Sequence, residues 1–197
     1  MGSRVVVIFL SNGEASHRSC CDVALEEIST KRRQHATDAM NVLGVDATDL
    51  YWLGLPDGQI HKRNNPEFAN AVSALSELLG EINPQVVYVT HPLDGWLDHS
   101  GASEITLGAI KRQNIGCSVH YYCVWIWHNL QFRNFHKAVG MSSYKLDIGS
   151  VFEQKREAIA RYFNETVPGC GGPYCGVLPE GFKENFMVPY EIYFRQE

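Results

Sequence analysis

Apolar positions along the chain follow two alternating patterns. Short runs of β-branched residues, such as Arg4–Leu10 and Gln85–Thr90, are typical of strands that are buried on both faces. Between these runs, apolar residues recur at three- and four-residue spacing, which predicts amphipathic helices. The predicted strands span residues 4–10, 49–53, 85–90 and 118–127, and the predicted helices span residues 29–44, 66–82, 100–112 and 151–163.

The last third of the chain is less regular. Residues 145–148 fit an edge strand, 166–181 a loop rich in glycine and proline, and 190–195 a final strand. Strands that alternate with helices of this length predict βαβ units. We therefore expect residues 1–197 to form a single three-layer α/β domain with a Rossmann-like, mainly parallel sheet.

Ligands of such sheets bind beyond the carboxyl ends of the strands. Three polar clusters occupy that position: Asn12–Glu14, Pro56–Gly58 and His91–His99. The function of the protein is therefore sought first in these clusters.

Charge and hydropathy exclude some classes of function. The 197 residues include 17 Lys and Arg against 22 Asp and Glu, a net charge of −5, which argues against binding of nucleic acid through a broad basic face. The longest apolar runs, Val5–Leu10 and Tyr121–Trp127, fall well short of the roughly 20 residues of a membrane-spanning helix. No secretory signal precedes Arg4, which predicts a cytoplasmic protein with reduced thiols.

Cysteine spacing adds little. The six cysteines form no C-x-x-C pair, so a structural zinc ribbon is not expected. Cys170 and Cys175 flank a loop rich in glycine and proline, and whether they pair is left open, although the expected compartment favours free thiols.

The densest group of reactive side chains lies between His91 and His99. Imidazole and carboxylate groups together suit a divalent transition metal. The alternative is a polar loop in which Asp98 and Ser100 cap the following helix. The segment can supply one or two metal ligands, whereas a catalytic zinc needs three.

Residues at the other strand ends have simpler alternatives. Glu14 and Asp57 can bind a ligand hydroxyl, but both lie in sequences that are typical of turns. Arg32 and Arg33 lie at the start of a predicted helix, and at least one of them is expected to be a solvated surface charge. Trp125 and Trp127 alternate on one face of a predicted strand, which suits packing or the lining of a sugar cleft.

The order of these segments resembles the PIG-L/LmbE family of zinc-dependent N-deacetylases. Each motif alone is short, and together they cover nearly the whole chain in the family's order. The segments that carry the resemblance are Ser11–Ser16, Arg32 with Ala39 and Leu43–Gly44, Leu53–Gly58, Pro84–His99, Lys155–Ala158 and Tyr190–Phe194.

The chain also departs from the family pattern. Members open with a strand that ends in His-Pro-Asp-Asp-Glu, ahead of the segment that is Arg4–Leu10 here, and this motif supplies two zinc ligands and the general base. We expect the given sequence to be N-terminally truncated, without this strand–helix unit, and residues 1–197 alone to be inactive. Trp96 occupies a position where many members carry a second histidine, and His35 replaces a glutamate.

The resemblance implies hydrolytic removal of an acetyl group from an N-acetylated amino sugar or its conjugate. It implies zinc as cofactor, with His99 as a catalytic residue and ligand, Asp98 as a catalytic residue that orients the site, and the other ligands in the missing segment. The implied substrate-binding residues are Glu14, Arg32, Asp57, Asp94 and Trp96.

Two other readings are kept. One is a catalytically dead member of the same fold that binds a sugar or a partner. The other, a nucleotide- or phosphate-binding α/β protein, is disfavoured because no glycine-rich loop follows a predicted strand. The apolar flank that a missing strand would leave exposed favours pairing of copies, so a homo-oligomer is also left open.

Overall fold

The computed structural model describes residues 2–18, 21–60, 66–128, 141–170, 178 and 181–196. The chain divides into two compact units. The first combines Met1–Asp57 with Gly149–Met187, and the second combines Gly58–Ile148 with Val188–Glu197.

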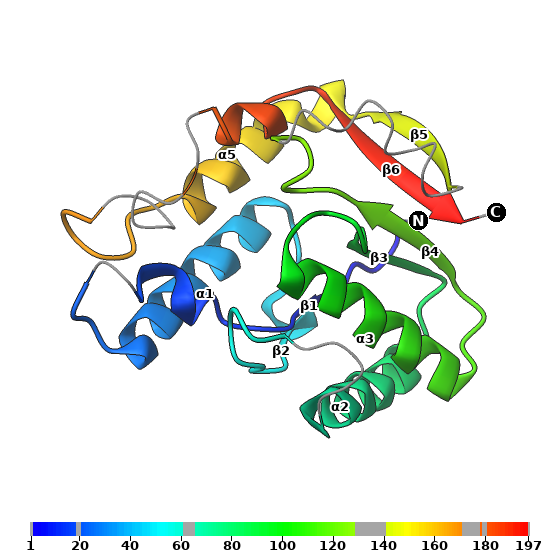
Figure 1. Ribbon diagram of the computed structural model, residues 1–197. Coiled ribbons are helices and arrows are strands. Elements are labelled where there is room, and N and C mark those ends of the chain that lie inside the picture. Colours follow the sequence, from blue (N-terminus) through cyan, green and yellow to red (C-terminus); the bar gives the residue numbers. More distant parts are fainter. Residues whose placement is uncertain are drawn as a thin grey trace. The chain divides into compact units, whose positions relative to one another are not determined.

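The first unit is built on one pair of parallel strands and two packed helices. Strand β1 pairs with β2 in parallel, with Val7 opposite Leu50 and Phe9 opposite Trp52. Helices α1 and α5 lie side by side (Figure 1). The elements are β1 (Val7–Phe9), η1 (Glu14–His17), α1 (Leu25–Val42), η2 (Ala47–Asp49), β2 (Leu50–Trp52), η4 (Gly149–Val151), α5 (Phe152–Tyr162) and η5 (Lys183–Phe186).

Helix α1 begins at Leu25, four residues before the predicted start at Ser29. Ser29 is a residue type that favours N-caps, but the helix begins after Ala24 without a side-chain cap. The buried stripe begins with Ile28 and continues through Arg32, Ala36 and Ala39, so burial of Ile28 carries the helix beyond the predicted boundary.

The second unit holds a four-stranded sheet in the order β3-β4-β6-β5. Strands β3 and β4 are parallel, and β6 is antiparallel to both of its neighbours. Helices α2 and α3 pack together, with the side chain of Val72 close to Gly108 and that of Gln113 close to Gly80. The elements are α2 (Pro66–Ile82), β3 (Val86–Thr90), α3 (Leu97–Gln113), β4 (Ser118–Tyr122), β5 (Met141–Asp147) and β6 (Tyr190–Gln196).

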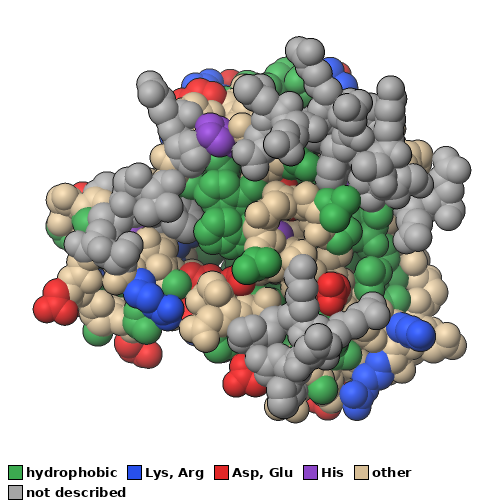
Figure 2. All heavy atoms as spheres, viewed as in Figure 1, with side chains coloured by type: hydrophobic (Ala, Val, Ile, Leu, Met, Phe, Trp, Pro, Cys, Tyr) green, Lys and Arg blue, Asp and Glu red, His purple; other side chains and the backbone are tan. Residues whose placement is uncertain are grey.

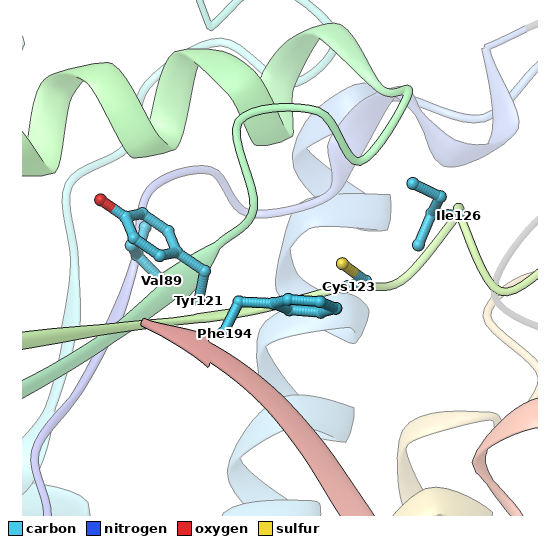
Figure 3. Packing of buried hydrophobic residues seen from close by; sticks show 5 residues of the cluster. All are labelled: Val89, Tyr121, Cys123, Ile126 and Phe194. Atoms are coloured by element: carbon cyan, nitrogen blue, oxygen red, sulfur yellow. The ribbon is translucent and has the colours of Figure 1, made fainter. Parts of the chain in front are cut away.

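The core of the second unit lies on one face of this sheet. Val89 on β3, Tyr121 on β4 and Phe194 on β6 are all buried. Cys123 and Ile126, which follow β4, complete the cluster (Figure 3). The core therefore includes the segment directly after β4 as well as the strands themselves.

The predicted α/β class is confirmed. Strand β1 pairs with β2 in parallel, and so does β3 with β4. Strand β6 pairs antiparallel with β4 and β5. The predicted strand over residues 118–127 ends at Tyr122, because the amides that follow bind a side chain, as described below. No helix among the described residues has the length and hydropathy to cross a bilayer.

Candidate functional site

The chemistry of the second unit centres on His99, in the first turn of α3. Its Nδ1 lies 2.5 Å from Oδ2 of Asp94, a residue that is completely buried. A carboxylate only accepts hydrogen bonds, which assigns the hydrogen to Nδ1. Nε2 is then the nitrogen with a free lone pair, and the His99 side chain is 24% exposed. Such an oriented imidazole is the arrangement found in metal-binding histidines.

Asp94 also organises the segment after β4. Its Oδ1 accepts the amide hydrogens of Val124 at 2.7 Å and Ile126 at 3.3 Å, and its Oδ2 accepts that of Trp125 at 3.1 Å. Together with the bond from His99, four hydrogen bonds satisfy this carboxylate, whose burial without partners would cost free energy. Substrate binding by Asp94 stays a prediction, and both of its carboxylate oxygens accept hydrogen bonds from within the protein.

Asp98 lies next to His99 but its carboxylate binds another segment. Oδ2 accepts the amide hydrogen of Gly58 at 2.7 Å, and Oδ1 accepts that of Ile60 at 3.1 Å. It makes no N-terminal cap, so the alternative in which Asp98 caps the helix is wrong. Gly101, one turn further along α3, allows close approach, since a Cβ there would lie 2.5 Å from the carbonyl oxygen of Ile60. Asp98 thus fixes residues 58–60 against α3, and its predicted catalytic role stays a prediction.

His91 is a core residue. It is fully buried, and its ring meets those of Tyr121 and Phe194 edge to face. Its Nδ1 accepts the amide hydrogen of Leu93 at 3.0 Å. Burial lowers the pKa of His91 from 6.5 to about 4, so the imidazole is neutral at physiological pH.

Trp96 borders this group. It precedes α3, is 43% exposed, and stacks on Trp125 with ring centres 4.9 Å apart and planes inclined by 14°. Trp125 lies in a turn after β4, so the prediction that Trp125 and Trp127 share a strand face is wrong. The Trp127 indole donates to the carbonyl of Cys123 at 2.6 Å and packs beside the core. Binding of substrate by Trp96 stays a prediction.

In the first unit, the strand ends carry Glu14 and Asp57. The Asp57 carboxylate accepts hydrogen bonds from the Ser11 hydroxyl and the Ala15 amide, both at 3.0 Å. Glu14 Oε1 accepts the amide hydrogen of Asp57 at 2.9 Å. The structure therefore brings these two predicted site residues together. Asp57 also lies in a turn, as the alternative predicts, and ligand binding by Glu14 and Asp57 stays a prediction.

Two hydrogen-bond acceptors at this strand end have no donor among the described residues. Oε2 of Glu14 and Oδ1 of Asn12 are both buried, and neither accepts a hydrogen bond from any residue that the structure describes. Buried polar atoms are usually satisfied in native proteins. Two acceptors without donors fit a ligand that brings hydroxyl or amide hydrogens.

Arg32 is buried in the first unit whereas Arg33 is exposed, which confirms the prediction that at least one of the two is a surface charge. The guanidinium of Arg32 lies 4.4 Å from the centre of the Tyr162 ring on α5, and Nη1 donates to the Tyr162 carbonyl at 3.4 Å. Gly13, with φ of 72°, passes so close that a Cβ would lie 3.2 Å from Arg32 Nε. Burial and the charge of Arg32 lower the pKa of His35. Sequence reasoning missed Tyr162, since no local pattern connects it to Arg32.

Zinc is fitted only in part by these residues. His99 has the accessible, oriented nitrogen that a metal ligand needs. The carboxylate oxygens of Asp94 and Asp98, in contrast, already accept hydrogen bonds from backbone amides. In the described ranges, no three His, Cys, Asp or Glu side chains come together as a possible metal site. These residues supply one ligand and do not make a complete zinc site.

Among the described cysteines, Cys117 and Cys123 are free thiols. Cys170 hydrogen-bonds with the thiol of Cys21. Cys175 lies outside the described residues, so its pairing with Cys170 stays open.

Comparison with known proteins gives one family match. The family model described as PIG-L, GlcNAc-PI de-N-acetylase, matches residues 1–110, more than half of the chain. A search of curated proteins found no match.

Several solved structures share the fold. The A40926 pseudoaglycone deacetylase Dbv21 is 13% identical with a TM-score of 0.69, covering 98% of this chain and 85% of its own. The N,N'-diacetylchitobiose deacetylase from Pyrococcus horikoshii is 17% identical with a TM-score of 0.61, covering 86% of this chain and 62% of its own. The 4-carboxy-2-hydroxymuconate hydratase GalB from Pseudomonas putida is 14% identical with a TM-score of 0.62, covering 95% of this chain and 81% of its own. At these identities the likeness shows the fold alone, which serves more than one reaction.

Proposed function

Because the chain belongs to the PIG-L family, we propose that the protein is a zinc-dependent hydrolase that removes the acetyl group from the nitrogen of an N-acetylated amino sugar or its conjugate. The family match supports an N-deacetylase type of function. The observation that carries the proposal is the His99–Asp94 pair. The buried carboxylate of Asp94 accepts a hydrogen bond from Nδ1 of the partly exposed His99.

His99 is proposed as one zinc ligand through Nε2, with Asp94 as the residue that sets its tautomer and orientation. A bound zinc ion supplies Lewis acidity toward an amide carbonyl and lowers the pKa of water. Since no three His, Cys, Asp or Glu side chains among the described residues form a group that could hold a metal ion, the proposal places the rest of the ligand set outside them.

Glu14 and Asn12 are proposed to bind the sugar. Each keeps a buried oxygen without a donor, and the hydroxyl groups of a sugar are suitable donors. Asp57 supports this site by holding Ser11 and Ala15, and Arg32 supports it by packing beside Gly13.

The test measures acetate and free amine released from N-acetylglucosamine conjugates. Protein purified from its natural source is used, so that every segment encoded with it is present. We expect release that a zinc chelator abolishes. His99→Ala should remove it and His128→Ala, a half-buried histidine after β4, should not. Turnover that survives in His99→Ala would refute the role of His99.

Residues 1–197 alone give a second measurement. With zinc added, we expect no turnover, because a catalytic zinc needs three protein ligands and the described residues contain no group of three that could hold a metal ion. Chelator-sensitive turnover would show that another group of this chain completes the site. Sugar binding by the natural protein without any release of acetate would instead support a non-catalytic member of the fold.

A further inference from the structure

Arg32 is a cation inside the first unit. Lys and Arg side chains are scattered over the face drawn in Figure 2, as expected of charged groups that stay in water. Arg32, in contrast, is 4% exposed. A buried cation costs free energy unless groups of the protein replace the water that it loses. The residues that contact the Arg32 guanidinium therefore decide where this charge lies.

Tyr162 contacts the guanidinium in two ways. Its ring centre lies 4.4 Å from Cζ of Arg32, and its carbonyl accepts a hydrogen bond from Nη1 of Arg32 at 3.4 Å. A cation–π contact is stronger where water is excluded from the pair. Because the ring and the carbonyl belong to one residue, Tyr162 fixes both the position of the guanidinium and the direction of one of its nitrogens.

The end of α5 explains why this carbonyl can accept a hydrogen bond. Tyr162 is the last residue of α5, and the last carbonyls of an α-helix have no amide partner within the helix. A positive charge is also favoured at that end by the helix dipole. Helix α5 packs against α1, which carries Arg32, and Ala158 is buried one turn before Tyr162. The packed helices therefore hold Tyr162 beside Arg32.

Arg32 in turn contacts the segment Asn12–Glu14 at Gly13. The φ of Gly13 is 72°, and a Cβ there would lie 3.2 Å from Nε and 3.7 Å from Cγ of Arg32. The backbone of Gly13 thus packs closely against the Arg32 side chain. Asn12 and Glu14, on either side of Gly13, carry the two buried oxygens that have no donor among the described residues. A displaced Arg32 side chain would remove the surface on which this segment packs.

We propose that Tyr162 is a positioning residue of the ligand site formed by Asn12 and Glu14. The ring and carbonyl of Tyr162 hold Arg32, and Arg32 holds Gly13 and the two oxygens beside it in the geometry that receives the ligand. Tyr162 acts through Arg32 and not by contact with the ligand. The identity of the ligand as an amino sugar rests on the proposed function.

The titration of His35 reports the position of the Arg32 charge without any ligand. Burial and the charges of Arg32 and Lys31 lower the pKa of His35, whereas Asp38 raises it. If the guanidinium leaves its place beside Tyr162, its effect on His35 becomes weaker. The pKa of His35 should then rise toward 6.5, which NMR titration of the histidine ring measures, with His35→Gln to assign the signal.

Amide exchange reports the geometry of the segment, also without a ligand. The Ala15 amide donates to the Asp57 carboxylate at 3.0 Å, and the Asp57 amide donates to Glu14 at 2.9 Å. If the segment Asn12–Glu14 loses its packing on Arg32, both amides should exchange their hydrogens faster.

The test compares Tyr162→Leu with Tyr162→Phe in residues 1–197. Tyr162→Leu removes the ring, so we expect a higher pKa of His35 and faster exchange at the two amides. Calorimetry should show an affinity for methyl N-acetylglucosaminide lowered at least about tenfold, the factor expected for loss of a desolvated cation–π contact. Tyr162→Phe keeps the ring and should retain all three values. Tyr190→Leu, the matched control, removes a half-buried ring that lies 3.7 Å from Lys145 Nζ in the second unit, and should also retain them.

Arg32→Lys keeps the proposal testable if Tyr162→Leu fails to fold. Lysine retains the charge but lacks the planar fork of donors, so this variant should also speed exchange at both amides and weaken binding of the glycoside. Adding Tyr162→Leu to Arg32→Lys should then have little further effect, because the contact is already lost. An unchanged His35 pKa with unchanged exchange in Tyr162→Leu, equal effects of Tyr162→Leu and Tyr162→Phe, or fully additive effects in the double variant would each overturn the proposal.

A failure of the proposed function gives a different result. If the parent chain does not bind the methyl glycoside, but Tyr162→Leu still raises the pKa of His35 and speeds exchange at both amides, then the amino-sugar ligand is wrong and the positioning role of Tyr162 stands.

Discussion

Asp94→Asn tests the central interaction of the site. The carboxylate accepts four hydrogen bonds, two at each oxygen, and an amide group can accept at one end only. With its NH2 at the Oδ2 position, the Trp125 amide loses its acceptor. With its NH2 at the Oδ1 position, the amides of Val124 and Ile126 both lose theirs.

The expected loss of stability follows from the number of hydrogen bonds that Asp94→Asn removes. A buried donor left without an acceptor costs about 1–3 kcal/mol, and loss of the charge from the remaining bonds adds to it. We expect Asp94→Asn to lower the free energy of unfolding by about 2–4 kcal/mol. An asparagine that donates to Nδ1 of His99 also moves the histidine hydrogen to Nε2, which should weaken zinc binding by about 10–100-fold.

Two assays on residues 1–197 measure these effects. Urea denaturation followed by tryptophan fluorescence gives the free energy of unfolding, and competition with a chromogenic chelator gives the zinc affinity. Asp22→Asn, at an exposed aspartate, is the control and should change stability by less than about 0.5 kcal/mol. If Asp94→Asn behaves like this control in both assays, the carboxylate does not hold the site as described.

Three further predictions concern other parts of the molecule. The folded-state pKa of His91 is about 4 against 6.5 when unfolded, so the unfolded chain binds more protons between these values, and stability that is complete above pH 6.5 should fall by about 3 kcal/mol as the pH drops toward 4. Denaturation of His91→Phe across this range should show a correspondingly smaller loss than the parent chain, and an identical pH dependence would contradict the assignment. Gly101→Ala should cost about 1–3 kcal/mol in denaturation experiments because its Cβ would meet a backbone carbonyl at 2.5 Å, whereas Gly116→Ala, with nothing within 4 Å, should cost far less. The hydrogen bond between the Cys21 thiol and Cys170, together with burial, raises the pKa of Cys21 to about 11, so iodoacetamide should label Cys21 slowly at pH 8 and faster in Cys170→Ala, as followed by mass spectrometry. Unchanged labelling in that variant would show that Cys170 has no such effect.

Local patterns predicted the regular elements of the chain well. Helix α2 has the predicted bounds of 66–82, since its apolar stripe and the proline after it are both local signals. The start of α1 was missed because Ser29 is a good cap in isolation, whereas burial of Ile28 is decided by tertiary packing.

The site was predicted as a set of residues but not as a set of contacts. Residues 123–127 are as apolar as a strand, yet Asp94, thirty positions earlier, binds the amides of Val124–Ile126 and ends β4 at Tyr122. The contact of Asp98 with Gly58 and Ile60 and that of Arg32 with Tyr162 likewise join residues far apart in sequence. Spacing along the chain carries no information about such partners.

The segment after β4 also has a consequence for hydrogen exchange. Irregular segments usually exchange their amide hydrogens quickly because water reaches them after small openings. Here the amides of Val124, Trp125 and Ile126 all donate to the buried carboxylate of Asp94, so they can exchange only when that carboxylate is released. Release also frees the His99 ring, because it shares the same acceptor. The hydrogen-exchange rate of these three amides therefore reports how often the segment opens in a way that releases the His99 ring.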